Sequence, residues 1–412
     1  MLVWLINPYG NIPGEGWSEY RSTMVARSLE KAGHDVVWWV SNFVHRAKTV
    51  RHVKSDTIQI SPSFTVRVVP STPYQSHISL SRIRYEQCYA RNLYHEALSS
   101  PRPDVVIIAD PSLFFCKPIL KLVEKWQTKL IVDVIDLWPE LFHIILPDWF
   151  SPLGKFLFLP LYRRRAALYR RADAIVAVTR DYLSLARTIS PKRYMEVVYW
   201  GADVPRMRNL LTTPVPLPLE LTSRSKSDGE VWAIYAGTLG DNYDIRSILK
   251  AAEIFVKKNV NIKLIIAGDG PLKQLVTGTI SEKNLMNTVY VGSLAPSALT
   301  YLYSFCDLAL STYIPRSTVS MPIKAFDYFV AGLPVLNSLK GDLGQMVEEN
   351  SVGLQYEAGN AESLAEMMTV LCSNADLRCK MSRNARLLGE SFDVAKQYYK
   401  FVNVVENVMI NL

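Results

Sequence analysis

Residues 321–336 read MPIKAFDYFVAGLPVL, and this stretch guides the interpretation of the whole chain. Pro322 can open a helix and Gly332 can end it, so the predicted order is loop, helix, turn and strand. Asp327 lies on the same helical turn as Lys324. A carboxylate there can accept hydrogen bonds from both hydroxyls of a ribose, and the preceding loop offers backbone N–H groups to a diphosphate. An amphipathic helix with a solvated Lys and Asp has the same pattern, so this stretch alone leaves both interpretations open.

The size and composition of the chain predict two globular domains. It has 412 residues, of which 49% are apolar, enough for two hydrophobic cores. No run of 18 apolar residues occurs, and the opening MLVWLINP reads as a buried strand rather than a secretory signal. The five cysteines are scattered without CxxC spacing. An odd number of cysteines at this spacing predicts free thiols in a reducing cytoplasm and no zinc site.

The positive charge is unevenly distributed along the chain. The formal net charge is +8, and it lies in residues 1–205, because acidic and basic residues balance in residues 206–412. A basic first half suggests contact with an anionic membrane surface or a phosphorylated acceptor. The alternative is a basic surface that only keeps the protein soluble. Nucleic acid is not expected, since the basic residues do not form a recognisable binding module.

Strands and helices alternate in both halves, which predicts an α/β protein with parallel sheets. The expected strands are Leu2–Ile6, Val36–Val40, Val105–Ile108, Leu130–Val134 and Ala174–Val178, then Val231–Ala236, Ile262–Ala267, Val289–Val291, Leu308–Leu310 and Pro334–Leu336. We expect domains at 1–204 and 230–392, separated by a Pro- and Ser-rich linker at 205–229. Residues 393–412 read as an amphipathic helix that packs back on the first domain.

Glycine-rich turns follow three of the predicted strands. The first-strand loop NPYGNIPGEGW contains Gly14 and Gly16 and is followed by Glu19 and Arg21; it is either a flexible lid or a backbone surface close to a phosphate or sugar. In the second half, the turns hold Gly237 with Thr238, and Gly268, Gly270 and Pro271. The second turn lacks the third glycine and later acidic residue of a dinucleotide fingerprint, so NAD binding is not expected.

Several motifs together resemble glycosyltransferase family 4, over nearly the whole chain. In the second half these are YAGTLG (235–240), IIAGDGP (265–271), CDLAL (306–310) and PIKAFDYFVAGLPVL (322–336). In the first half, GHDVVWW (33–39), RADAIVAVT (171–179) and DLWPE (136–140) resemble its landmarks, and DLWPE resembles a subgroup that builds bacterial surface polysaccharide. The resemblance implies the GT-B fold, in which two Rossmann-like domains face across a cleft.

The resemblance also implies a donor site in the second domain. Asp327 stands where the family has the second Glu of its E-x7-E motif, which binds the ribose hydroxyls, and Val319 stands where the first Glu would be. The family's basic pair for the diphosphate falls on Thr238 and Tyr243 here. Lys324 and Arg246 are therefore the candidate substitutes, with Arg316 as a third option, because a leaving diphosphate requires compensating charge. Further donor contacts are expected from Met321 and Ile323.

In the first domain, Asp136 occupies the loop where many relatives have a His beside the donor sugar. It can orient the acceptor or the sugar, whereas Glu140 is expected only to cap the turn. Glu19 and Arg21 are expected to point into the same cleft. Residues 141–171 combine aromatic and aliphatic side chains with a run of arginines, which is typical of a segment lying in a membrane interface, or of a core helix with a solvated basic end.

Taken together, the motifs and the resemblance predict a glycosyltransferase that needs no metal and no cofactor, and the resemblance implies that it retains the anomeric configuration. Its partners would be a nucleotide-sugar donor and a lipid-linked or saccharide acceptor, with residues 141–171 on an anionic membrane at the cytoplasmic face. Surface polysaccharide synthesis is the expected role. Two alternatives remain: a GT-B sugar-nucleotide epimerase, which would convert the donor without an acceptor, and a non-catalytic sugar-nucleotide or glycan binding protein, since Val319 and the basic-pair positions depart from the family.

Overall fold

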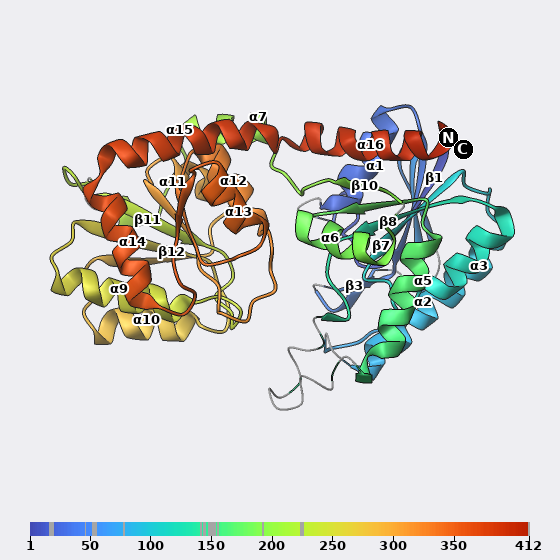
Figure 1. Cartoon of the computed structure of the whole chain (residues 1–412), viewed down its shortest axis with the longest axis horizontal. Helices are drawn as coiled ribbons and strands as arrows, with labels where there is room; N and C mark the ends of the chain where they lie inside the picture. The colour runs from blue at the N-terminus through green and yellow to red at the C-terminus, as the bar shows by residue number, and fades with distance from the viewer. Residues whose placement is uncertain are drawn as a thin grey trace. The chain divides into compact units, whose positions relative to one another are not determined.

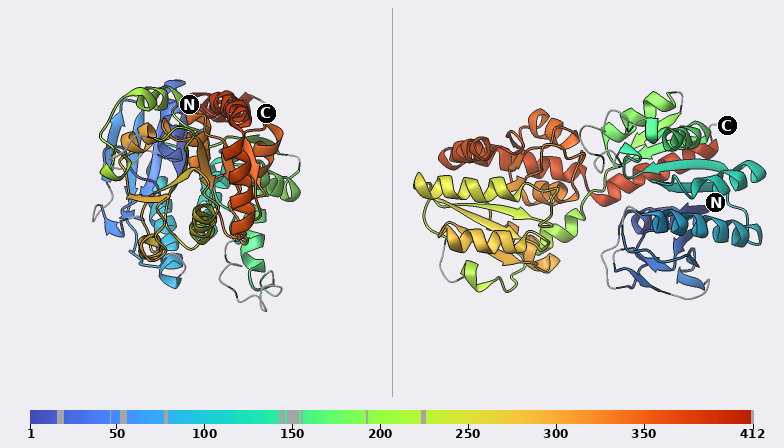
Figure 2. Two further views of the ribbon diagram at one scale, coloured as in Figure 1. Left: turned by 90° about the vertical axis from the view of Figure 1, so that its left-hand side faces the viewer. Right: turned by 90° about the horizontal axis from the view of Figure 1, so that it is seen from below.

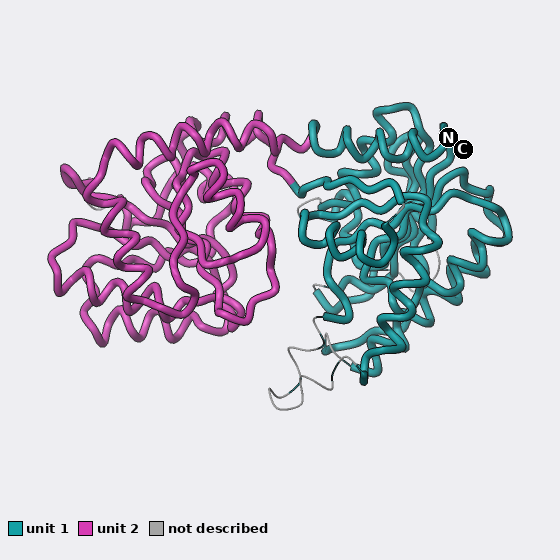
Figure 3. Tube along the Cα trace, viewed as in Figure 1, with its two compact units in different colours: residues 1–200, 395–412 teal, residues 201–394 magenta. Residues whose placement is uncertain are grey.

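The computed structural model divides the chain into two compact units. The first contains Met1–Trp200 and Ala395–Leu412, and the second contains Gly201–Val394 (Figure 3). The structure describes residues 1–15, 20–45, 47–51, 56–76, 79–140, 142, 146, 154, 156–191, 193–222 and 226–410.

The first unit is built on an eight-stranded sheet in the order β10-β9-β8-β7-β1-β2-β6-β5 (Figure 1). All neighbouring strands are parallel except β5 and β6, which form an antiparallel edge. Its strands are β1 (Leu2–Ile6), β2 (Asp35–Ser41), β5 (Asp56–Ser61), β6 (Phe64–Val69), β7 (Val105–Asp110), β8 (Lys129–Val134), β9 (Ala174–Ala177) and β10 (Tyr194–Val197). A separate antiparallel pair joins β3 (Phe43–Val44) to β4 (Thr49–Val50). Strand β7 is buried at every position, as expected inside a sheet covered by helices.

Helices pack on the first-unit sheet through apolar stripes. One core combines sheet residues such as Trp4 and Ile108 with side chains from α2, α3, α5 and α6. On α1, the Arg21 guanidinium lies 5.8 Å from the ring centre of Tyr398 on α16, so the last helix of the chain belongs to this unit. The helices are α1 (Arg21–Lys31), α2 (Leu80–Leu98), α3 (Cys116–Trp126), α5 (Leu159–Arg171), α6 (Arg180–Ile189) and α16 (Val394–Ile410).

The second unit is built on a six-stranded parallel sheet in the order β13-β12-β11-β14-β15-β16. Helices cover both faces, with α9, α10 and α14 on one and α7, α11, α12 and α15 on the other (Figure 2). Its strands are β11 (Val231–Ala236), β12 (Ile262–Ala267), β13 (Thr288–Gly292), β14 (Leu308–Ser311), β15 (Val335–Asn337) and β16 (Gly353–Gln355). Its helices are α7 (Val204–Thr212), α8 (Leu219–Thr222), α9 (Ile245–Lys257), α10 (Lys273–Glu282), α11 (Pro296–Tyr303), α12 (Ile323–Ala331), α13 (Asp342–Glu349), α14 (Ala361–Ser373) and α15 (Ala375–Ser391).

The predicted linker at 205–229 is wrong for its first part, because that part is helical and belongs to the second unit. Asp203 caps α7 by accepting a hydrogen bond from the Arg206 N–H at 3.1 Å, and Pro205 takes a first-turn position that needs no N–H partner. Met207 is buried where α7 packs against α11 and α12. The proline therefore starts a helix in a stretch whose composition resembles a linker.

Both sheets have a point where the strand order reverses. In the first unit β1 has β2 on one side and β7 on the other, and in the second unit β11 lies between β12 and β14. Ligands of open α/β sheets bind beyond the carboxyl ends of strands at such points. The loops after these strands are therefore the expected positions of ligand-binding residues. Among the described residues, no helix has both the length and the apolar character needed to cross a bilayer.

Candidate functional site

Lys324 lies in the first turn of α12, near the strand-order reversal of the second unit. Its Nζ is buried, and no hydrogen-bond partner for it occurs among the described residues. The ammonium instead faces three aromatic rings, whose centres lie 4.1 Å away for Tyr235, 5.3 Å for Tyr243 and 5.4 Å for Tyr313. Aromatic faces attract a cation but give it no hydrogen bonds, so its donors stay unused.

Burial has a clear effect on the protonation of Lys324. It lowers the pKa of the ammonium to about 7, because the charged form has lost its water without gaining an anion. The group lies beside the turn after β11: a Cβ built on Gly237 would be 3.6 Å from Lys324 Nζ. An anion resting on this turn would meet the ammonium directly.

Asp327 lies one helical turn further along α12. Its side chain is half-buried, and no described residue forms a hydrogen bond or an ion pair with it. Burial raises the pKa of its carboxyl to about 7. Lys324 and Asp327 are thus two ionisable groups, one helical turn apart, with no hydrogen-bond or ion-pair partner among the described residues, as expected of groups that await a ligand.

The glycine turns after β11 and β12 touch each other through their backbones. A Cβ on Gly268 would lie 1.8 Å from the Gly237 carbonyl oxygen, and one on Gly270 would lie 2.5 Å from that of Leu239. The Gly237 N–H donates to the Ala267 carbonyl at 3.0 Å, which ties the turns together. Gly268 and Gly270 therefore permit the packing of two turns, and Gly237, whose open side faces Lys324, is the better candidate for ligand contact.

The other residues predicted to contact the donor differ in how exposed they are to solvent. Thr238 and Pro271 are exposed in their turns, Ile323 is 44% exposed at the start of α12, and Met321 is buried. Arg246 is exposed in the first turn of α9, and no described contact joins it to Lys324. Of the three predicted cations, Arg246 and Arg316 are exposed, whereas the ammonium of Lys324 is enclosed by aromatic rings.

The first unit has its own cavity, of about 620 Å³, at the reversal between β1 and β7. Its wall includes Tyr9 from the loop after β1, Asp110 from the end of β7, and Asp136 and Trp138 from the loop after β8. Arg82 from α2 closes one side. This mixture of carboxylates, a cation and aromatic rings suits a polar ligand with flat or apolar parts.

Asp136 is the predicted catalytic residue in this unit, and it lies in the cavity wall. Part of its surface is open to the cavity, but burial of the carboxyl raises its pKa to about 6. The charge of Arg82 opposes this rise and that of Asp110 adds to it. Glu140 instead forms a bidentate ion pair with Arg165 at 2.5 and 2.9 Å, so it fixes the loop to α5.

Arg21, which is predicted to point into the cleft with Glu19, lies in the cavity wall but has its charge paired inside the first unit. Its guanidinium is buried and forms two 2.7 Å bonds with Asp133, and it donates to the Val198 carbonyl at 2.7 Å. Its charge is therefore used within the fold, although the residue contributes to the cavity wall. Gly14 has a φ of +92° and is exposed, but it does not line the cavity; Gly16 and Glu19 lie outside the described residues.

The segment predicted to meet a membrane is described only in part. Residues 141, 143–145, 147–153 and 155 lie outside the described residues. Phe156 and Leu157 are 75% and 56% exposed, which fits an apolar surface. The arginines are not all available, because Arg165 pairs with Glu140 and Arg171 lies 3.4 Å from Asp173.

Both halves of the chain match family models of glycosyl transferases. A model described as a glycosyl transferase 4-like domain matches residues 18–201, and one described as glycosyl transferases group 1 matches residues 221–388. The chain belongs to the group 1, 4-like glycosyltransferases. The first matched range includes the cavity wall of the first unit apart from the loop after β1, and the second includes the Lys324 site.

The glycosyltransferase has full-length structural neighbours of low sequence identity. Sucrose-phosphate synthase from Thermosynechococcus elongatus matches with a TM-score of 0.74, 14% identity and 100% of each chain. HepE from Anabaena, solved with UDP, matches with a TM-score of 0.67, 14% identity, and 98% of this chain and 99% of that one. These likenesses establish the GT-B fold of two Rossmann-like domains.

Curated relatives match over shorter stretches. Chitobiosyldiphosphodolichol beta-mannosyltransferase of Debaryomyces hansenii is 26% identical over 132 residues, which is 30% of this chain and 28% of that protein. This chain spans less than a third of the length of the first three curated relatives that it matches.

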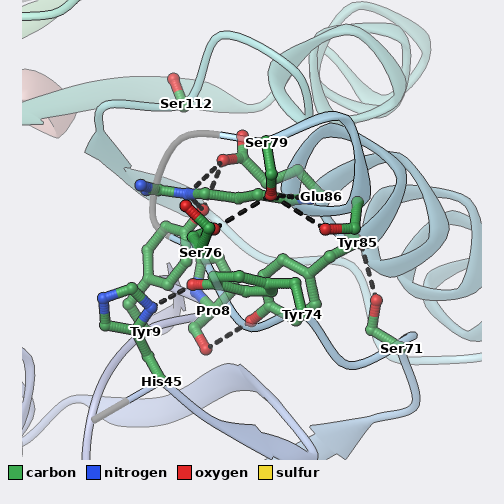
Figure 4. Close-up of polar contacts among 12 residues, drawn as sticks. Pro8, Tyr9, His45, Ser71, Tyr74, Ser76, Ser79, Tyr85, Glu86 and Ser112 are labelled. Carbon is green, nitrogen blue, oxygen red and sulfur yellow. Dashed lines mark hydrogen bonds and ion pairs between the residues drawn. The ribbon is translucent and has the colours of Figure 1, made fainter. Parts of the chain in front are cut away.

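Sequence reasoning missed a buried polar cluster behind the glycosyltransferase's first cavity (Figure 4). The Tyr9 hydroxyl donates to Glu86 at 2.5 Å, Arg82 Nε lies 3.4 Å from the same carboxylate oxygen, and His45 contacts the Tyr74 hydroxyl. Burial raises the pKa of Glu86 to about 7, against the hydrogen bond of Tyr9 and the charge of Arg82. The four-residue spacing of Arg82 and Glu86 on one helix was the signal available in the sequence.

Proposed function

We propose that this protein transfers a sugar from a nucleoside diphosphate donor, bound in the second unit, to an acceptor bound in the first. The observation that carries the proposal is Lys324, a buried ammonium without a hydrogen-bond partner among the described residues, beside an open glycine turn. A diphosphate would supply the missing negative charge. Asp327 would accept hydrogen bonds from the ribose hydroxyls, since no described residue already bonds to it.

The same arrangement supports catalysis as well as binding. During transfer the bond between the anomeric carbon and the diphosphate oxygen breaks, and negative charge grows on the leaving group. Lys324 is placed to stabilise that charge, and its contribution increases as the bond breaks. The acceptor hydroxyl forms the new bond to the anomeric carbon, and its proton passes to the leaving phosphate, with retention of configuration. Asp136 would orient the acceptor hydroxyl or the sugar.

We further propose a lipid-linked saccharide as acceptor, in surface polysaccharide synthesis at the cytoplasmic membrane face. The exposed apolar side chains at Phe156 and Leu157 support contact with lipid. A relative whose name specifies a dolichol diphosphate saccharide supports an acceptor of this class. UDP is the first nucleotide to test, because the structural neighbour HepE was solved with it.

The test is a mass-balance assay on the purified protein with a panel of nucleotide sugars, with and without a bacterial lipid extract. The proposal predicts release of nucleoside diphosphate, stimulated by the extract, and a glycosylated lipid in the extract. A donor converted to its epimer without the extract would instead identify an epimerase. Tight donor binding without turnover on any extract would identify a binding protein.

A further inference from the structure

A second, almost wholly apolar pocket lies in the first unit next to the polar cavity. Its volume is about 340 Å³. The side chains that make it apolar are Leu80, Ile83, Phe114, Phe142, Phe158 and Leu161. They come from the start of α2, the loop before α3, the loop after β8 for Phe142, the residue before α5 for Phe158, and the first turn of α5 for Leu161. An apolar cavity of this kind binds hydrocarbon more favourably than water.

The apolar pocket and the polar cavity share two wall residues, Arg82 and Trp138. The Arg82 guanidinium lies 4.3 Å from the centre of the Trp138 ring. From Trp138 a row of rings continues into the apolar pocket, with centres 4.8 Å apart to Phe142 and a further 5.3 Å to Phe158. A ligand spanning both spaces would pass from polar to apolar surroundings at Arg82.

The outer side of the apolar pocket carries exposed apolar side chains. Leu80 is 84% exposed, and Leu159, at the start of α5, is 40% exposed. Leu80 belongs to the pocket wall and Leu159 follows the wall residue Phe158, so both offer apolar contact to a ligand that leaves the pocket. Arg163 on α5 is also exposed, which adds positive charge on the same helix.

Charge selects the class of ligand at the junction. Arg82 is the cationic side chain that lines both spaces, and it also contacts Tyr9 and Glu86, the latter a member of the apolar pocket's wall. A phosphate keeps its charge at neutral pH and binds a guanidinium through two parallel hydrogen bonds. A ligand with a phosphate at Arg82 and a hydrocarbon chain beyond it would satisfy both spaces.

We propose that the apolar pocket holds the first part of the hydrocarbon chain of a lipid-phosphate acceptor, and that Arg82 binds the phosphate at the junction. The proposal rests on the proposed function, whose acceptor it specifies. The saccharide would then occupy the polar cavity, near Asp136. The chain beyond the pocket would leave past Leu80 towards a membrane.

The first test measures binding of farnesyl phosphate, a short isoprenoid phosphate, by calorimetry below its micelle concentration. Farnesol and inorganic phosphate are the comparison probes. We expect farnesyl phosphate to bind at least about tenfold more tightly than either, because only it uses both spaces. Equal binding of farnesol and farnesyl phosphate, or of phosphate and farnesyl phosphate, would overturn the proposal.

Two variants locate the binding. Leu80→Ala should weaken farnesyl phosphate binding about tenfold through lost apolar contact. Its matched control is Leu219→Ala, because Leu219 is 81% exposed and also begins a helix; it should leave the affinity unchanged. Arg82→Gln should reduce the preference for farnesyl phosphate over farnesol to about one, with farnesol affinity retained. Equal effects of the two leucine variants would refute the assignment.

The same preparations distinguish failure of this proposal from failure of the proposed function. UDP binding, assigned to the second unit, should be unchanged in Leu80→Ala. If native protein binds UDP but shows no selective binding of farnesyl phosphate, the lipid assignment alone is wrong. If the native protein binds none of the nucleoside diphosphates, the donor assignment is wrong whatever the lipid result.

Discussion

Replacing Lys324 by Met tests the donor site most sharply, because stability and affinity should change in opposite directions. Methionine keeps a long apolar side chain among Tyr235, Tyr243 and Tyr313 but removes the charge. In the ligand-free protein the ammonium is buried without a hydrogen bond to any described residue. Removing the ammonium should therefore increase the stability of the ligand-free fold, because a desolvated charge is no longer buried. It should decrease the affinity for a diphosphate, which loses its cationic partner.

The size of both effects follows from the pKa of Lys324. A displacement from 10.5 to about 7, at about 1.4 kcal/mol per unit, sets an upper limit of about 5 kcal/mol on the cost of the charged form. Since the side chain as a whole is only half-buried, we expect Lys324→Met to stabilise the ligand-free protein by about 1–3 kcal/mol. Losing a charge-assisted hydrogen bond should weaken nucleoside diphosphate binding about 10- to 100-fold.

The pH dependence of these effects has a definite sign. Because the folded-state pKa of Lys324 is lowered, the stability gained in Lys324→Met is complete below about pH 7 and disappears as the pH rises towards 10.5. A bound diphosphate favours the charged ammonium, so native protein should take up a proton on binding at pH 8. Its affinity should fall as the pH rises from 8 to 9.5, and the variant should lose this dependence.

Calorimetry measures the affinities for UDP and for uridine, which lacks the diphosphate, and thermal unfolding measures the stability of the ligand-free protein. Lys324→Met should bind UDP weakly but uridine normally, and its melting temperature without ligand should rise. The control is Lys263→Met, because Lys263 is buried on β12 with its Nζ 5.2 Å from the centre of the Trp232 ring, and its loss should leave UDP affinity unchanged. Unchanged UDP affinity in Lys324→Met, or equal losses of UDP and uridine affinity, would refute the reasoning.

Four further changes give separate predictions. Asp327→Asn should weaken uridine binding about tenfold, and the native rise in uridine affinity between pH 6 and 8, expected because the Asp327 pKa is about 7, should disappear in calorimetric titrations. Arg21→Met should destabilise the first unit by about 3–5 kcal/mol in denaturant unfolding, since it leaves the buried Asp133 unpaired, with UDP affinity unchanged. Gly268→Ala should lower both the melting temperature and UDP affinity, because its Cβ would meet the Gly237 carbonyl oxygen. Asp136→Asn should reduce sugar transfer to the lipid extract with little change in UDP affinity; a parallel loss of UDP affinity would contradict its place in the acceptor unit.

The sequence predicted the sheets well where strands are continuously apolar. All ten expected strands lie in or overlap with strands of the structure, because parallel strands buried on both faces give long apolar runs. The edge pair β5 and β6 was not predicted, since its exposed positions interrupt the apolar pattern. The helix α7 was not predicted because its prolines and polar residues also suit a linker.

Within the candidate site, the sequence predicts proximity only for residues that lie on one element. Lys324 and Asp327 share one helical turn, so their proximity could be read from spacing alone. The tyrosines around Lys324 come from three separate segments, and only the fold brings them together. Arg21 shows the opposite case: it follows a glycine loop as expected, but Asp133, far away in sequence, takes up its charge. Long-range pairing of this kind has no signal in a single sequence.

The most direct test of the donor site is a crystal structure of the full-length protein after the crystals have been soaked with UDP. We expect a β-phosphate oxygen within hydrogen-bond distance of Lys324 Nζ, on the Gly237 turn, and the ribose hydroxyls on the Asp327 carboxylate. UDP bound elsewhere, with Lys324 still enclosed only by its tyrosines, would contradict this expectation.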